Sequence, residues 1–211
     1  QGTAVSYVEA LFDQYAPQFE EALVGRLGYT VPDQLNQLLD AEMARLGIAH
    51  FHRALDLGCG TGLMGTRLRD KVAWLEGIDL SAAMIAETAR KGIYDQLAKA
   101  ELVEFLAGQS AGNDLVTAAD VFIYCGALPP VLAAVTPAMS PGGLLIFSLE
   151  EHDGEEALFL RPSLRYAHSH AATQQALVDA GLVALRFERA VLRQDRGAHI
   201  VGMLIVAQKP A

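Results

Sequence analysis

Residues 53–62 read Arg53-Ala54-Leu55-Asp56-Leu57-Gly58-Cys59-Gly60-Thr61-Gly62. A short apolar run ends at Asp56-Leu57, three glycines follow at alternate positions, and a helical pattern begins at Leu63. A strand, a glycine turn and the start of a helix present backbone N–H groups to a ligand with no Cβ in the way. We therefore predict a ligand site here, and the carboxylate of Asp56 at the strand end favours a ligand with a cationic group.

A second interpretation of the same loop is a dinucleotide site. Residues 60–65, Gly60-Thr61-Gly62-Leu63-Met64-Gly65, fit the pattern G-x-G-x-x-G, and Asp79 follows at a distance suited to a ribose contact. In that motif the first glycine ends the strand, but Gly58 already holds this place, and Asp56 would put negative charge near a pyrophosphate. A nicotinamide or flavin site is therefore the less favoured alternative, beside a purely structural turn.

Length and composition favour a single α/β domain with an added helical segment, because the chain has 211 residues, 52% of them hydrophobic and 19% charged. No apolar run of membrane-spanning length is free of charge or proline, so no membrane partner is expected. The net charge of −9 disfavours a nucleic-acid partner, which needs clustered Lys and Arg. The two cysteines, Cys59 and Cys125, lack zinc spacing, so we expect no metal and a reducing cytoplasm.

From residue 48 onward the chain alternates between strand and helix patterns, which predicts a parallel sheet with helices on both faces. Helix 170–180 is followed by two long strands at 183–193 and 198–208, which predict a C-terminal hairpin. Helical spacing at 3–27 and 33–46 makes residues 1–47 a helical cap and 48–211 the ligand-binding domain. The other predicted strands are 53–57, 73–78, 97–100, 115–119 and 143–149, and the other helices are 62–70, 81–91, 102–108 and 127–139.

The pattern Asp-x-Gly-x-Gly-x-Gly at residues 56–62 resembles the first motif of class I methyltransferases. The resemblance implies a Rossmann-like, doubly wound, mostly parallel sheet of seven strands that ends in an antiparallel hairpin. It also implies S-adenosylmethionine as the methyl donor and S-adenosylhomocysteine as the product. The segments 7–19, 118–124 and 165–169 are similar to bacterial predicted methyltransferases that often carry tetratricopeptide repeats, which implies a protein partner bound through upstream repeats.

The resemblance also assigns roles around the methyl donor. Asp79 would accept hydrogen bonds from the ribose hydroxyls, Leu80 would pack on the adenine, and Glu101 with the backbone of Leu102 would reach the adenine edge. The alternative for Asp79 is a helix cap, and the alternative for Glu101 is a first-turn residue that stabilises the helix dipole. The complete set of expected donor contacts is Asp56, Gly58, Cys59, Gly60, Gly62, Asp79, Leu80, Met84, Glu101, Leu102, Ala118, Ala119 and Tyr15.

The acceptor, which we expect to be a small molecule, should meet the residues that follow the fifth strand. His168 or His170 could take a proton near neutral pH, and Asp120 would stand near the reaction centre. Arg161 or Arg165 could hold a carboxylate or a phosphate of the acceptor. No residue stands out as a general base, so a catalytically silent donor-binding protein remains an alternative.

Overall fold

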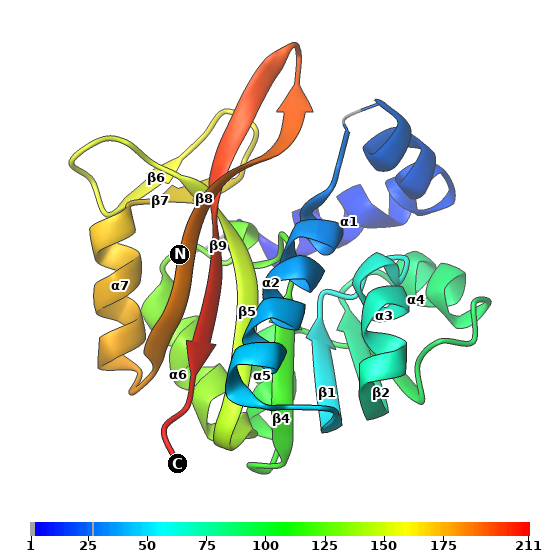
Figure 1. The fold of residues 1–211 in the computed structure, drawn as a ribbon. Helices are drawn as coiled ribbons and strands as arrows, with labels where there is room; N and C mark the ends of the chain where they lie inside the picture. Colours follow the sequence, from blue (N-terminus) through cyan, green and yellow to red (C-terminus); the bar gives the residue numbers. More distant parts are fainter. Residues whose placement is uncertain (1–2, 27) are drawn as a thin grey trace.

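The computed structural model describes residues 3–26 and 28–211 (Figure 1). Residues 1, 2 and 27, the last of them in the predicted helix 3–27, lie outside the described residues. Within the described part of the chain, no helix is long and apolar enough to cross a membrane.

A nine-stranded mixed sheet forms the centre of the molecule. Five strands lie in the order β3-β2-β1-β4-β5. Most of β5 is paired with β9, which is paired in turn with β8. The end of β5 is paired with β7, which is paired in turn with β6. The strands are β1 (Phe51–Leu57), β2 (Val72–Asp79), β3 (Gln96–Lys99), β4 (Asn113–Ala118), β5 (Met139–Glu151), β6 (Leu158–Leu160), β7 (Tyr166–His168), β8 (Val183–Asp195) and β9 (Ala198–Gln208).

The predicted Rossmann-like architecture is confirmed, and all seven predicted strands are present. The sheet gains two further strands, β6 and β7, from the segment where a loop was expected. β5 is 13 residues long, and its pairing with β9 ends at Glu150 opposite Gly202. Glu150 also pairs with Ala167 of β7, and Glu151 pairs with His168, so β7 extends the pairing of β5 beyond the end of β4 opposite Phe147. In the C-terminal hairpin, β9 alone runs antiparallel to β5, because β8 reverses direction again.

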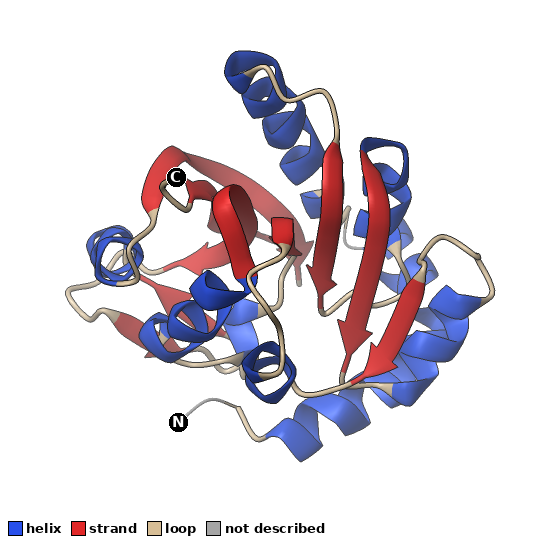
Figure 2. Ribbon diagram, turned by 90° about the horizontal axis from the view of Figure 1, so that it is seen from below, coloured by secondary structure: helices blue, strands red, loops and turns tan. Residues whose placement is uncertain are grey.

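Helices cover both faces of the sheet, and Figure 2 shows them on either side of the strands. Successive side chains of a strand point to opposite faces. Leu144 and Ile146 of β5 therefore join the core under α2 and α3, whereas Leu145 and Phe147 join the core under α5, α6 and α7. The helices of this part are α2 (Val31–Leu46), α3 (Leu63–Leu68), α4 (Ala82–Ala89), α5 (Leu102–Ala107), α6 (Leu128–Ala138) and α7 (His170–Asp179), with short helical turns η3 (Arg69–Lys71) and η4 (Phe122–Tyr124).

The N-terminal helices lie at the edge to which the arrows of β1 and β2 point (Figure 1). They are α1 (Val5–Tyr15), η1 (Ala16–Gln18) and η2 (Glu21–Arg26), and the break at Ala16 agrees with the expected effect of Pro17. Ion pairs of Glu9 with Lys99 and of Glu20 with Lys91 tie these helices to the main domain. The N-terminal helices therefore cover the carboxyl ends of the strands, where open α/β sheets bind ligands.

Candidate functional site

The loop between β1 and α3 has the backbone that only glycine adopts easily. Gly58, Gly60 and Gly62 have φ angles of 60°, 54° and 89°. A Cβ on Gly58 would lie 2.4 Å from Cγ2 of Val121, and a Cβ on Gly62 would lie 2.4 Å from Oγ1 of Thr88. The loop is thus shaped by close approach of other chain segments, and its backbone remains open toward the carboxyl end of β1.

Asp56 is a buried carboxylate below this loop. Its two oxygens accept hydrogen bonds from the hydroxyl of Tyr94 at 2.6 Å and from the hydroxyl of Thr117 at 2.8 Å. Burial raises the pKa of Asp56 to about 6, although both hydroxyls favour the ionised form. A cation in contact with Asp56 would restore the ionised state, so the group is suited to the ammonium of an amino acid.

Tyr94 is a residue that the sequence analysis missed. Its ring fills space that any side chain on Gly65 or Gly77 would need. A Cβ on Gly65 would lie 2.2 Å from the phenol oxygen, and a Cβ on Gly77 would lie 2.7 Å from the ring. Glycines inside a helix and inside a strand are the sequence signal for such a close approach. The two glycines indicate that another side chain packs against them, but they do not identify that side chain.

Asp79 connects the end of β2 with the glycine loop. One carboxylate oxygen accepts from the backbone N–H of Gly60 at 3.0 Å, and the other from the N–H of Ser81 at 2.9 Å. Burial raises the pKa of Asp79. Ser81 in turn caps α4, as its side chain accepts from the N–H of Met84. Since a carboxylate has about four lone-pair positions, Asp79 can hold both backbone groups and still accept from a diol.

A small cavity of about 40 Å³ lies over Asp56. One water molecule takes up roughly 30 Å³ of the liquid, so a nucleoside enters only when part of the wall moves. The side chain of Phe19, which would lie 3.8 Å from a Cβ on Gly60, belongs to that wall. The lining residues are Phe19, Tyr29, Pro32, Asp56, Gly58, Cys59, Gly60, Thr61, Leu63, Met64 and Ala119.

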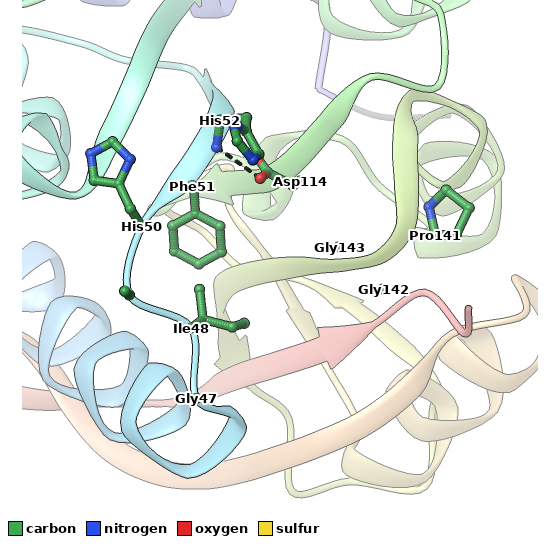
Figure 3. Close-up of a pocket in the computed structure, with 10 residues that line it drawn as sticks. Gly47, Ile48, His50, Phe51, His52, Asp114, Pro141, Gly142 and Gly143 are labelled. Carbon is green, nitrogen blue, oxygen red and sulfur yellow. Dashed lines mark hydrogen bonds between the residues drawn. The ribbon is translucent and has the colours of Figure 1, made fainter.

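A larger hollow of about 540 Å³ lies at the opposite edge of the sheet, at the amino ends of β1 and β4 (Figure 3). There the carboxylate of Asp114 accepts from the backbone N–H groups of His52 and Arg53, both at 2.8 Å. Figure 3 shows the imidazole of His50 directed away from Asp114. The carboxylate is therefore occupied by the backbone, and the hollow lies away from the carboxyl ends where such folds bind ligands.

The N-terminal helices reach the site through residues other than the expected Tyr15. Tyr15 is 48% exposed on α1. Phe12 instead meets the ring of Phe19 at 6.2 Å and the ring of Tyr124 at 5.6 Å, both edge-on. The structure thus brings Phe12 and Phe19 over the glycine loop, while a contact of Tyr15 with the methyl donor stays a prediction.

The remaining expected donor contacts lie around the same edge. Glu101 is the N-cap of α5, where its carboxylate accepts from the N–H of Glu104 at 2.8 Å. Met84 and Ala118 have no exposed surface, and Leu102 has 8%. Leu80 is half-buried, and Ala119 lines the small cavity. Contacts of these residues with a ligand stay predictions.

The structure separates the three candidate catalytic residues. His168 is buried, its Nε2–H donates to the carbonyl of Gly126 at 2.8 Å, and burial lowers its pKa. It is therefore a neutral histidine held in place by the backbone. His170 is exposed at the start of α7, where its ring meets the edge of Phe187 at 4.0 Å. Neither histidine is placed as the expected proton acceptor.

Asp120 lies at the end of β4 with a left-handed backbone, φ 54°. Its carboxylate accepts from the hydroxyl of Ser148 at 2.9 Å and from Nη1 of Arg193 at 2.7 Å. Arg193 was not predicted, because nothing in the strand pattern of 183–193 marks it. These contacts let Asp120 hold Arg193 in position, while a place for Asp120 near the reaction centre stays a prediction.

In the residues that the structure describes, no group of three or more His, Cys, Asp and Glu side chains is placed to hold a metal ion.

Comparisons with known proteins agree with this geometry. Residues 55–145 match the model of a methyltransferase domain. The chain is 31% identical over 189 residues to malonyl-[acyl-carrier protein] O-methyltransferase of Enterobacter lignolyticus, which covers 83% of this chain and 72% of the relative.

Two solved structures show the same fold. Magnesium protoporphyrin IX methyltransferase of Synechocystis PCC 6803 with bound S-adenosylmethionine superposes with a TM-score of 0.63 at 20% identity, over 83% of this chain and 78% of that one. The [4+2]-cyclase SpnF superposes with a TM-score of 0.76 at 17% identity, over 100% and 97%. The glycine loop, the two strand-end carboxylates and these likenesses together show that the chain belongs to the class I methyltransferases, with S-adenosylmethionine as cofactor.

Proposed function

We propose that the protein transfers the methyl group of S-adenosylmethionine to an oxygen atom of a small-molecule acceptor. The observation that carries this proposal is the pair of carboxylates at adjacent strand ends. Asp56 lies under the glycine loop, and Asp79 is hydrogen-bonded to Gly60 within it. One suits the ammonium of the methyl donor and the other its ribose. The O-methyltransferase of Enterobacter lignolyticus supports oxygen as the methylated atom.

When bound, S-adenosylmethionine supplies a methyl group on a positively charged sulfur. The acceptor oxygen forms the new bond to carbon as the bond from carbon to sulfur breaks, and the electron pair of that bond stays on sulfur. This displacement needs alignment of the two reactants and exclusion of water. Phe12 and Phe19, which lie between the N-terminal helices and the glycine loop, are placed to exclude water.

The state of the nearby titratable groups favours an acceptor that is already ionised. His168 is neutral and donates to a carbonyl, and Asp120 is paired with Arg193. A general base helps only when the acceptor must lose a proton. An acceptor oxygen that carries its negative charge at neutral pH can react without one, so we expect such an acceptor here.

Two measurements test the proposal in sequence. Titration of the protein with S-adenosylhomocysteine should show binding, and incubation with S-adenosylmethionine and oxygen acceptors (phenols, alcohols and carboxylic acids) should release S-adenosylhomocysteine. Binding without transfer to any acceptor would instead identify a silent donor-binding protein. A link to tetratricopeptide repeats, and through them to a protein partner, stays a prediction that capture experiments can test.

A further inference from the structure

Three arginines converge at the carboxyl ends of β4 and β5, away from the glycine loop. Arg193 lies within 2.7 Å of Asp120 and also pairs with Glu150. Nε of Arg161 lies 3.2 Å from Glu150, and Nη1 of Arg165 lies 3.6 Å from it. Glu150 and Arg193 are almost completely buried, at 1% and 3% exposure. The buried carboxylate of Glu150 and the partly buried one of Asp120 thus face three guanidinium groups.

Arg165 makes the longest contacts of the three arginines. Among the described residues, its side chain meets oxygens only at long range: the hydroxyl of Tyr124 at 3.4 Å, Glu150 at 3.6 Å and Asp195 at 3.9 Å. Arg161, by contrast, donates to the carbonyl of Glu151 at 2.6 Å. A guanidinium has five N–H donors in a fork that matches a carboxylate. The side chain of Arg165 is 21% exposed, so its unused donors can be reached from solvent.

The turn between β6 and β7 holds Arg161 and Arg165 in place. The N–H of Arg161 donates to the carbonyl of Arg165, and the N–H of Leu164 donates back to the carbonyl of Arg161, both at 2.9 Å. Thr3 adds a hydrogen bond from its hydroxyl to the carbonyl of Leu164 and one from its N–H to the carbonyl of Tyr124. The two guanidinium groups therefore start from a backbone that is fixed on both sides.

Two chains of contacts connect the arginines with the methyl-donor pocket. The first runs from Arg193 through Asp120 to Tyr29, which lines the small cavity and whose pKa is raised by burial and by Asp120. The second runs from Arg165 through Tyr124 and Phe12 to Phe19. The arginines are thus linked, through Asp120 on one side and through Tyr124 and Phe12 on the other, to residues that line the small cavity.

We propose that Arg165, with Arg161 beside it, binds a carboxylate of the acceptor, and that Glu150 and Arg193 position the two arginines. This inference rests on the proposed methyl transfer. A bound carboxylate would exchange the long contacts of Arg165 for short, charge-assisted hydrogen bonds. Because the three carboxylates of Glu150, Asp120 and Asp195 balance the three arginine charges, the site suits a monoanionic group better than a phosphate dianion.

The test measures binding of simple acids to the protein saturated with S-adenosylhomocysteine. The probes are benzoate, octanoate and glutarate, each with its neutral amide, and inorganic phosphate. We expect at least one acid to bind more tightly than its amide and than phosphate. The variant R165Q should bind that acid with an affinity lower by roughly tenfold or more, which is the scale of one lost hydrogen bond to a charged group. R165K keeps the positive charge but lacks the paired N–H donors of a guanidinium. Its affinity for the acid should therefore lie between those of R165Q and the unmodified protein.

The matched control is R90Q, since Arg90 is an exposed arginine on the surface near the end of α4 and pairs with Glu87. It should leave acid binding unchanged. Affinity for S-adenosylhomocysteine, measured for every variant, reports whether the fold is retained. Three results would overturn the inference while the methyl-donor site stands, provided that S-adenosylhomocysteine binds. They are that no acid binds more tightly than its amide, that phosphate binds most tightly, or that R165Q binds the acids as tightly as the unmodified protein does. If the nucleoside does not bind the unmodified protein, the proposed function fails as well.

Discussion

The phenol oxygen of Tyr94 lies 2.6 Å from the carboxylate of Asp56, two residues that are 38 positions apart in the chain. The tyrosine reaches the end of β1 through space that Gly65 and Gly77 leave open. Its hydroxyl donates to a carboxylate whose pKa burial raises to about 6. The protein therefore holds an acid at the methyl-donor site that is ready to ionise near neutral pH.

Binding of the methyl donor should strengthen as the pH rises through about 6, because its ammonium needs the ionised form of Asp56. The same raised pKa means that Asp56 lowers the stability of the free protein as the pH rises from about 4, its ordinary pKa, to about 6. Removing the hydroxyl in Tyr94→Phe should move the affinity profile to higher pH. Titrations with S-adenosylhomocysteine between about pH 5 and about pH 8 test this. An unchanged profile in the variant would show that Tyr94 does not affect the titration of Asp56.

Replacing Asp79 should loosen both the ribose site and the glycine loop. Asp79→Ala removes the acceptor for the N–H of Gly60 and for the N–H of Ser81. We expect the variant to bind S-adenosylhomocysteine more weakly by about 1–3 kcal/mol, the scale of leaving a polar partner unpaired. Asp79→Asn keeps an acceptor oxygen, so it should lose less affinity for S-adenosylhomocysteine than Asp79→Ala does. Equal affinity of Asp79→Ala and the unmodified protein would remove Asp79 from the site.

Gly58 should be irreplaceable for two separable reasons, its left-handed backbone and the contact with Val121. Gly92 has a similar φ of 63° but open space around it, so Gly92→Ala measures the backbone strain alone. We expect that variant to cost about 1–2 kcal/mol of unfolding free energy. Gly58→Ala should lower the unfolding free energy by about 1–3 kcal/mol more than Gly92→Ala does, because its Cβ would also overpack against Val121. Urea denaturation of both variants provides the comparison, and equal losses would show that Val121 moves aside freely.

The N-terminal helices should open to admit the methyl donor, because the cavity over Asp56 measures only about 40 Å³. Amide hydrogen exchange in α1, η1 and η2 should slow when S-adenosylhomocysteine is bound. Phe19→Ala removes part of the wall and should speed association of the nucleoside. Exchange that is the same with and without the nucleoside would mean that these helices are not the entrance.

The buried charges around Arg193 should depend on one another. Arg193→Met leaves Glu150 and Asp120 without their shared partner, and breaking a buried pair in this way costs about 3–5 kcal/mol. Adding Glu150→Gln removes a buried carboxylate that would otherwise keep only the longer contacts with Arg161 and Arg165. The double variant should therefore be more stable than Arg193→Met alone when both are unfolded in urea. Additive losses from the two changes would contradict the coupling.

The sequence predicts the strands of the sheet and the glycine loop, for physical reasons that are local. Asp56 and Asp79 each end an apolar run, and parallel strands bring such ends to one edge of the sheet. The three glycines mark the loop between β1 and α3 because the backbone there requires left-handed conformations. These features depend on spacing within short segments, so the printed sequence is enough to find them.

Features that depend on the tertiary arrangement could not be predicted in this way. Arg193 comes 73 residues after Asp120, and only the pairing of β9 with β5 and of β8 with β9 brings the two together. β6 and β7 are three residues each, too short for a period to show. His168 looked like a proton acceptor because its burial and its bond to Gly126 are invisible in the sequence.

The most direct test of the account is a calorimetric titration of the protein with S-adenosylhomocysteine, with NADH titrated in parallel. The account predicts micromolar binding of S-adenosylhomocysteine, with loss of affinity in Asp79→Ala, and no binding of NADH. Binding of NADH with no binding of S-adenosylhomocysteine would contradict the assignment of Asp56 and the glycine loop to a methyl donor.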